Sequence, residues 1–181
     1  MAFLEGDRVA LVPLDPDEDA HVEAYRRSRV DARMRATGAS DRGGLTTGRA
    51  REEVREKGEP STAAPCAIRA EGEVVGWAST AVRDERARVA MLAYYVLPDW
   101  QGRGYASEAA RLLADYAFDE LNARRLEAHV LAGNPASVRV LEKLGFTEEG
   151  RKRDAYYRDG EYRDALVFGL LEGERSDGAG A

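Results

Sequence analysis

The sequence predicts a mixed α/β (α+β) fold with a central sheet of about seven strands and about four helices. Short apolar runs with strand spacing are interleaved with longer runs of helical spacing. A strand, a helix and a second strand follow one another within residues 88–131, an order that requires a right-handed crossover between parallel strands. A glycine-rich turn joins the first of these strands to its helix. The 181 residues fit one domain, expected at residues 1–173, with a flexible tail at 174–181.

The expected elements follow the chain in a simple order. Strands are predicted at residues 8–14, 66–70, 74–82, 88–97, 125–131, 147–157 and 161–171. Helices are predicted at residues 15–29, 49–57, about 107–122 and 134–145. Pro16 and the acidic residues around it indicate the first helix start, and Asn134–Pro135 indicates the last. Short turns join residues 66–97 as an antiparallel meander and residues 147–171 as a hairpin.

Charge and cysteine content exclude several classes of protein. The formal net charge is −6, so a general nucleic-acid or anionic-membrane binder, which needs a basic excess, is not expected. The single cysteine, Cys66, cannot form an internal disulfide, and no metal site is expected. No cationic leader with an apolar core opens the chain, and no apolar run approaches the roughly 20 residues of a membrane span. We therefore expect a soluble cytoplasmic protein.

The segment from Asp99 to Ala106, Asp-Trp-Gln-Gly-Arg-Gly-Tyr-Ala, is the strongest functional signal. Gly102 and Gly104 permit a tight turn and close approach of a ligand to the backbone. The following helix directs its unpaired N–H groups and the positive end of its dipole at the same place. No Gly-Lys-Ser/Thr follows and the third glycine of a dinucleotide fingerprint is missing. The segment therefore predicts a pyrophosphate cradle, and it ranks nucleotide hydrolysis and hydride transfer lower as functions.

Several further motifs lie in order around this cradle: Tyr94-Tyr-Val-Leu-Pro98, Gln101-x-x-Gly104-x-Ala106, Asn134-Pro-Ala-Ser137 and Val140-Leu-Glu-Lys-Leu-Gly-Phe146. Together they resemble the GCN5-related N-acetyltransferase (GNAT) superfamily, in particular its RimJ/RimL-like branch of ribosomal-protein-alanine N-acetyltransferases. The resemblance covers residues 74–171 well and the N-terminal third only loosely. It implies the GNAT acyl-CoA N-acyltransferase fold.

The resemblance also implies acetyl-CoA as the acetyl-donor cosubstrate. It implies that the strand end at Tyr95 and Val96 leaves its parallel neighbour and pairs with the pantetheine arm. Asn134 is implied as a pantetheine contact, although a simple helix cap explains this residue as well. The remaining implied cofactor-binding residues belong to the cradle: Gln101, Gly102, Arg103, Gly104, Tyr105 and Ala106.

The catalytic residues are harder to assign, because Met91 and Leu141 stand where many family members carry an acidic residue and a tyrosine acid. Ser137 remains as a candidate hydrogen-bond donor toward the leaving thiolate, or as a second capping hydroxyl. The unperturbed pKa of a histidine suits His129 to taking a proton from the amine, and Glu127 on the same strand face could tune it. A purely structural histidine is the alternative.

We interpret the chain as an enzyme that moves an acetyl group directly to a primary amine, with a protein N-terminal amino group as the acceptor. The alternatives are a small amine acceptor (a polyamine, an amino sugar or an amino-acid-like metabolite) and a non-catalytic acyl-CoA sensor. A monomer or a homodimer is expected. An arginine run contacts either solvent or one of the substrates: Arg26, Arg27, Arg29, Arg33, Arg35 and Arg42.

Overall fold

The computed structural model describes residues 2–35, 44–59, 62–158 and 160–175, and its strands form one eight-stranded sheet. The strand order is β1-β2-β3-β4-β5-β6-β8-β7, and only the neighbours β5 and β6 are parallel. The strands are β1 (Leu4–Glu5), β2 (Ala10–Pro13), β3 (Ala63–Ala70), β4 (Glu73–Asp84), β5 (Val89–Val96), β6 (Arg125–Leu131), β7 (Thr147–Arg158) and β8 (Glu161–Leu171). The predicted fold class is confirmed, and the additional strand is the two-residue β1.

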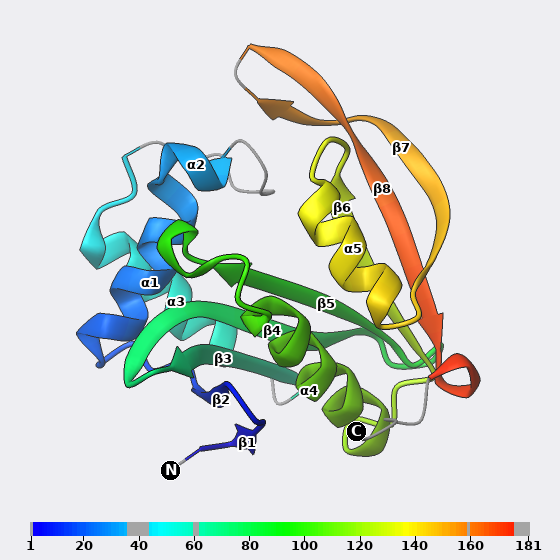
Figure 1. Cartoon of the computed structure of the whole chain (residues 1–181), viewed down its shortest axis with the longest axis horizontal. Helices are drawn as coiled ribbons and strands as arrows, with labels where there is room; N and C mark the ends of the chain where they lie inside the picture. Colours follow the sequence, from blue (N-terminus) through cyan, green and yellow to red (C-terminus); the bar gives the residue numbers. More distant parts are fainter. Residues whose placement is uncertain (1, 36–43, 60–61, 159, 176–181) are drawn as a thin grey trace.

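Helices cover both faces of this sheet (Figure 1). The described residues contain α1 (Asp19–Val30), α2 (Ala32–Arg35), α3 (Thr47–Gly58), α4 (Tyr105–Asp119) and α5 (Pro135–Lys143). The larger core lies under α4 and α5 and is centred on side chains such as Leu113 and Leu126. A smaller core under α1 and α3 includes Tyr25 and Trp77. The sheet is therefore the middle of three layers, and β5 contributes side chains to both cores. None of the described helices is long and apolar enough to cross a bilayer.

The prediction for the start of the first helix was wrong. Asp15 accepts a hydrogen bond from the Asp17 amide through its carboxylate (2.8 Å) and donates its own amide to His21 Nδ1 (3.1 Å). These bonds stabilise a turn, so that Pro16 precedes the helix and α1 begins only at Asp19. At the other end of the chain, most of the expected tail, residues 176–181, lies outside the described residues.

The parallel pair opens into a V. Three residue pairs join β5 to β6, from Val89 with Arg125 to Met91 with Glu127. Beyond them, β5 continues to Val96 and β6 to Leu131 without pairing to each other. This confirms the expected parting of the strands near Tyr95 and Val96, and it leaves the facing backbone groups of both strands without ladder partners.

The end of β5 is held instead by β4. Gly76 pairs with Val96, and a Cβ atom at Gly76 would lie 2.1 Å from the Tyr95 carbonyl oxygen. No side chain fits at this distance, so glycine permits an unusually close approach of the two strands. The Leu97 amide continues the contact by donating to the Val75 carbonyl (2.8 Å). The V therefore opens on the β6 side while β5 stays with the antiparallel part of the sheet.

Candidate functional site

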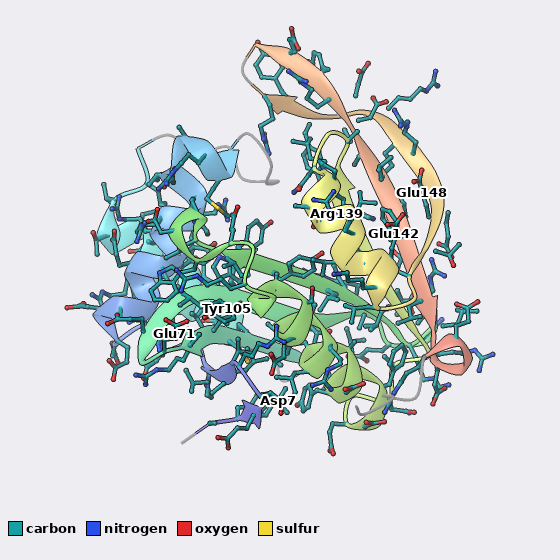
Figure 2. The ribbon with its side chains drawn as sticks, in the orientation of Figure 1. Asp7, Glu71, Tyr105, Arg139, Glu142 and Glu148 are labelled. Carbon is teal, nitrogen blue, oxygen red and sulfur yellow. The ribbon has the colours of Figure 1, made fainter. Side chains whose placement is uncertain are left out.

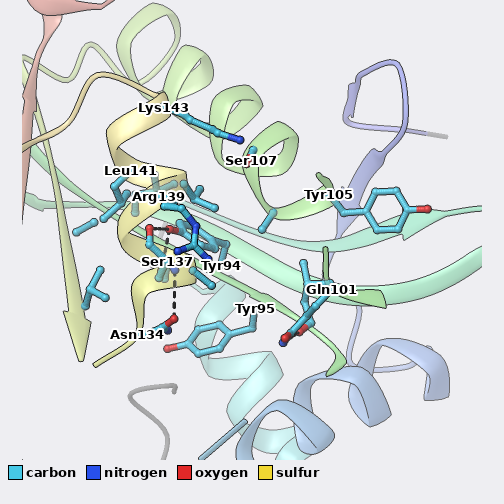
Figure 3. Close-up of a pocket in the computed structure, with 18 of the residues that line it drawn as sticks. Tyr94, Tyr95, Gln101, Tyr105, Ser107, Asn134, Ser137, Arg139, Leu141 and Lys143 are labelled. Carbon is cyan, nitrogen blue, oxygen red and sulfur yellow. Dashed lines mark hydrogen bonds between the residues drawn. The ribbon is translucent and has the colours of Figure 1, made fainter. Parts of the chain in front are cut away.

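A cavity of about 470 Å³ occupies the opening between β5 and β6 (Figure 3). Its walls come from these two strands, the glycine turn, the first turn of α4 and one side of α5. Ten of the twelve predicted site residues line it: Tyr95, Val96, Gln101, Gly102, Gly104, Tyr105, Ala106, His129, Asn134 and Ser137. Arg103 and Glu127 do not line it. Segments that are far apart in sequence thus meet around one opening.

The glycine turn is fixed to the strand end by a side chain. Gln101 Nε2 donates to the Val96 carbonyl oxygen (2.9 Å), which ties the turn to the tip of β5. Gly102 and Gly104 both have left-handed backbone conformations, with φ values of +78° and +85°. A Cβ at Gly104 would also lie 2.7 Å from Arg8 Nη1. Both glycines are therefore required by backbone geometry, as the cradle prediction assumed.

The cradle ends in a helix N-terminus with free donors. α4 begins at Tyr105, two residues earlier than predicted, and Gly104 is its N-cap. Glu108 N donates to the Gly104 carbonyl (3.1 Å), so the amides of Tyr105, Ala106 and Ser107 precede the first helical bond. Those amides and the helix dipole form an anion site at the cavity wall.

Two cradle side chains point away from the cavity. The Tyr105 hydroxyl donates to Glu71, and Figure 2 shows the two residues side by side. Arg103 forms an ion pair with the same carboxylate (3.2 Å) and lies over the Trp100 ring, 4.8 Å from its centre. Arg103 and Tyr105 can therefore serve an anionic ligand through their backbone only, and their side chains brace the turn from outside.

The start of α5 combines a helix cap with two hydroxyl groups. Asn134 Oδ1 accepts from the Ser137 amide (3.1 Å), which confirms the predicted N-cap. The Ser137 hydroxyl lies 2.9 Å from the Tyr94 hydroxyl, which extends from β5. Burial raises the pKa of Tyr94 to about 12, against the opposing effect of its bond with Ser137. Leu141 lines the cavity one turn further along the helix, as an apolar wall.

Sequence reasoning missed two cations in this wall. Arg139 and Lys143 line the cavity from α5, and Lys143 extends toward Ser107 on α4 (Figure 3). No carboxylate of the described residues lies within ion-pair distance of either side chain. The sequence did contain a signal for them. Arg139 and Lys143 are four residues apart in a helix whose start was predicted, so they lie on one face of that helix. Together with the α4 amides, they make this end of the cavity electropositive.

His129 lines the opposite side of the opening. Its Nε2 lies 3.3 Å from Lys152 Nζ on β7. Burial and the Lys152 charge lower the pKa of His129, while Glu127 raises it by a smaller effect. The imidazole is therefore neutral at pH 7 and able to accept a proton. Glu127 is engaged by Arg125 Nε (3.0 Å), so it acts on His129 only across space.

The Tyr95 ring forms part of the wall on the α1 face of the sheet. It stacks on Trp77 with 4.7 Å between ring centres, and Trp77 donates to the Ser28 hydroxyl (2.7 Å). Burial raises the pKa of Tyr95, and nearby Arg29 and Arg158 oppose this rise. No Asp or Glu of the described residues lines the cavity. Among the described residues its charged lining is therefore basic.

Much of the arginine run is engaged in ion pairs. Arg27 and Arg33 both contact Asp99, at 3.2 Å and 3.0 Å, and Arg26 contacts Glu23 at 2.7 Å. These pairs favour the interpretation as a solvated helix face. The side chain of Arg35 and all of Arg42 lie outside the described part of the chain.

A mixed sheet opened between two parallel strands, with an anion cradle on one side and a neutral histidine on the other, defines an acyl-CoA-dependent acyltransferase architecture. The chain belongs to the acetyltransferase (GNAT) domain family, whose model matches residues 8–147. Acetyl-CoA is the acetyl donor of that family.

Two curated relatives support this membership. "Putative ribosomal N-acetyltransferase YdaF" of Bacillus subtilis is 35% identical over 104 residues, which are 58% of this chain and 57% of the relative. The spermidine N(1)-acetyltransferase of Escherichia coli K12 is 31% identical over 105 residues, 58% of this chain and 56% of the relative. The matched segments thus span little more than half the length of these relatives, whose acceptors differ.

A solved structure supports the fold over nearly the whole chain. RimL, a ribosomal L7/L12 alpha-N-protein acetyltransferase in complex with coenzyme A, aligns with a TM-score of 0.83. The alignment covers 94% of this chain and 98% of RimL at 19% identity, so it establishes likeness of fold.

Proposed function

We propose that this protein is an N-acetyltransferase that moves the acetyl group of acetyl-CoA directly to a primary amine, with a protein N-terminal amino group as the acceptor. One observation carries the proposal: a single cavity passes between β5 and β6, with the glycine cradle on one side and His129 on the other. A donor and an acceptor entering from the two sides would meet in the opening, which favours direct transfer through proximity.

The residues present fit acetyl-CoA. Its diphosphate matches the free amides of Tyr105 to Ser107 and the nearby cations Arg139 and Lys143. Its extended, amide-bearing arm matches the edge of β5 that has no strand partner beyond Met91. We call the cradle, α4 and α5 the donor side of the cavity. The Tyr95 ring and His129, with Lys152 beside His129 and outside the lining, form its acceptor side.

The proposed chemistry assigns a role to each side chain. Acetyl-CoA supplies a carbonyl activated by a thiol leaving group. His129, neutral at pH 7, accepts the proton that the attacking amine loses. Ser137 donates a hydrogen bond to the departing sulfur. Cys66 takes no part, because it is buried in the larger core, where burial raises its thiol pKa to about 12.

The lining charges distinguish among acceptors. A polyamine carries several ammonium groups, and binding it requires carboxylates. Among the described residues no carboxylate lines the cavity, while Lys152 stands beside His129. A peptide N-terminus carries one amine and a neutral backbone, so it meets less repulsion. A small amine that carries a carboxylate is the second candidate, favoured by Lys152.

The test is acetyl-CoA binding by calorimetry, followed by thiol release with a panel of amines. We expect release with peptides that have a free N-terminus, none with the same peptides N-terminally blocked, and little with spermidine. Strong release with spermidine would overturn the proposed acceptor. Binding without release would point to an acyl-CoA sensor, and absence of binding would overturn the site itself.

A further inference from the structure

We infer that Tyr94 is a positioning residue for Ser137, and that the two hydroxyl groups together stabilise a thiolate in the cavity. The inference rests on the proposed function and goes beyond it, since it adds a residue that is distant in sequence from Ser137. Both side chains line the cavity, and their contact is drawn in Figure 3.

The contact between the two hydroxyls admits an arrangement in which the Ser137 proton is available to a third group. Tyr94 Oη lies 2.9 Å from Ser137 Oγ and 3.2 Å from the Ser137 carbonyl oxygen. The one phenolic proton of Tyr94 thus always has an acceptor on Ser137. When it is donated to Oγ, the serine hydroxyl is free to direct its own proton at a third group, and a hydroxyl that accepts a bond becomes a stronger donor.

The pair is held from both sides of the opening. Tyr94 belongs to β5, and Ser137 belongs to the first turn of α5, 43 residues later. The Ser137 amide is fixed by Asn134 Oδ1 (3.1 Å). Tyr94 stays protonated under ordinary conditions, because burial raises its pKa to about 12. The hydroxyls therefore remain oriented donors, as the stabilisation of a developing anion requires.

The step balances without a protein acid. As the carbon–nitrogen bond forms and the carbon–sulfur bond breaks, the electron pair passes to sulfur and the amine proton passes to His129. Ser137 donates a hydrogen bond to the sulfur and keeps its proton, because a thiol titrates near about 8.5 and an alcohol is a far weaker acid. The thiolate takes its proton from water after release.

A structural role for the same contact would be simple attachment of α5 to β5. The distinguishing measurement uses CoA alone: the thiolate absorbance of bound CoA is titrated with pH. We expect the thiol pKa of bound CoA to lie below that of free CoA, and to rise in Tyr94→Phe and in Ser137→Ala. We expect the double variant to match Ser137→Ala, because Tyr94 acts through Ser137.

Tyr116→Phe is the matched control. This variant also removes one phenolic hydroxyl, but from a residue of α4 that lies outside the cavity lining. The Tyr116 ring packs on Phe3 with 4.9 Å between ring centres. We expect no change in the thiol pKa for this variant. An equal thiol pKa in wild type and Tyr94→Phe would overturn the inference, and so would a further rise when Tyr94→Phe is added to Ser137→Ala.

Turnover provides the second measurement. We expect kcat to fall roughly tenfold in Tyr94→Phe at unchanged KM for acetyl-CoA, the size of one hydrogen bond to a charged group. A lowered thiol pKa without any turnover would support the hydroxyl pair and overturn the proposed transferase. Turnover without a lowered thiol pKa would support the proposed transferase and overturn the hydroxyl pair. Failure to bind CoA would overturn both proposals.

Discussion

The donor side and the acceptor side of the cavity are built from different kinds of sequence. The donor side comes from two segments of the chain, the glycine turn with α4 and, after β6, the helix α5. Its key groups are backbone amides and two cations. The acceptor side gathers Tyr95 from β5, His129 from β6 and Lys152 from β7. Its key groups are side chains, and burial and the charge of one of them, Lys152, lower the pKa of another, His129. A shared donor and a variable acceptor fit this division.

The largest expected effect on acetyl-CoA binding comes from adding one methyl group to the glycine turn. Gly104→Ala places a side chain at φ +85°, which costs roughly 1–2 kcal/mol for an L-residue. If the turn relaxes to relieve this strain, the amides lose their alignment, and the Kd for acetyl-CoA rises about five- to thirtyfold in calorimetry.

Gly72→Ala is the control for this prediction. Gly72 has the same left-handed conformation (φ +86°) with nothing near its missing Cβ, and it lies outside the cavity lining. We expect a similar loss of thermal stability and an unchanged Kd for acetyl-CoA. An unchanged Kd in Gly104→Ala as well would show that the turn does not hold the donor.

The two unpredicted cations provide the next test. Arg139→Gln and Lys143→Gln together should weaken acetyl-CoA binding about tenfold at low salt, from roughly 0.5–1 kcal/mol for each exposed charge interaction. The difference should shrink as salt is raised, because screening weakens exposed charge interactions. Arg124→Gln, an exposed arginine just before β6, removes a charge outside the cavity lining and should change nothing. A salt-independent loss would contradict the electrostatic explanation.

The acceptor side is tested through pH. Lys152 lowers the pKa of His129, so Lys152→Met should raise it. Because the base acts when neutral, its activity is lost as pH falls through this pKa. The acidic limb of kcat/KM should therefore move to higher pH. Arg151→Met, next in the chain but paired with Asp164 at 3.2 Å, should leave the limb in place. An unmoved limb in Lys152→Met would remove His129 from the base role.

The smallest expected effect concerns Asn134, and the test distinguishes its role as a helix cap from a role as a donor contact. Asn134→Ala should cost about 1 kcal/mol of unfolding free energy through loss of the α5 cap, measured by denaturant titration. Asn134→Ser restores a cap but not the amide group. If Asn134 also contacts the donor, serine should restore stability and leave acetyl-CoA binding weakened. Full recovery of both would reduce Asn134 to a helix cap.

The sequence predicted best what is determined locally. Asn134–Pro135 at the start of α5 and Gly145–Phe146 at its end have the bonds that their residue types favour, including Phe146 N to the Leu141 carbonyl (3.0 Å). The parting of the strands at Tyr95 and Val96 was expected from family resemblance, and the pairing of β5 with β6, which ends at Met91, confirms it. The short elements β1 and α2 were missed because two or four residues carry no readable period.

The sequence predicted poorly what depends on contact between distant residues. Tyr94 belongs to a motif of the family resemblance and was a candidate proton donor or pocket wall, but its contact with Ser137 had no signal, because the two residues lie 43 positions apart. The Lys152 contact with His129 depends on β8 lying between β6 and β7 in the sheet. The predicted helix start at Asp15 was wrong for a different reason. Its sequence pattern suits a helix start but also an Asx turn, and the structure has the turn.

The three residue pairs between β5 and β6 also have a mechanical meaning. β5 is paired with β4 up to Gly76 and Val96, and β6 is paired with β8 over its whole length. The sheet therefore consists of two parts that are joined only by the three residue pairs between β5 and β6. A molecule that forms hydrogen bonds with both strands at the opening links the two parts of the sheet. Acetyl-CoA would then stabilise the fold as well as donate the acetyl group. Its binding should raise the melting temperature and slow amide exchange in both parts of the sheet at once.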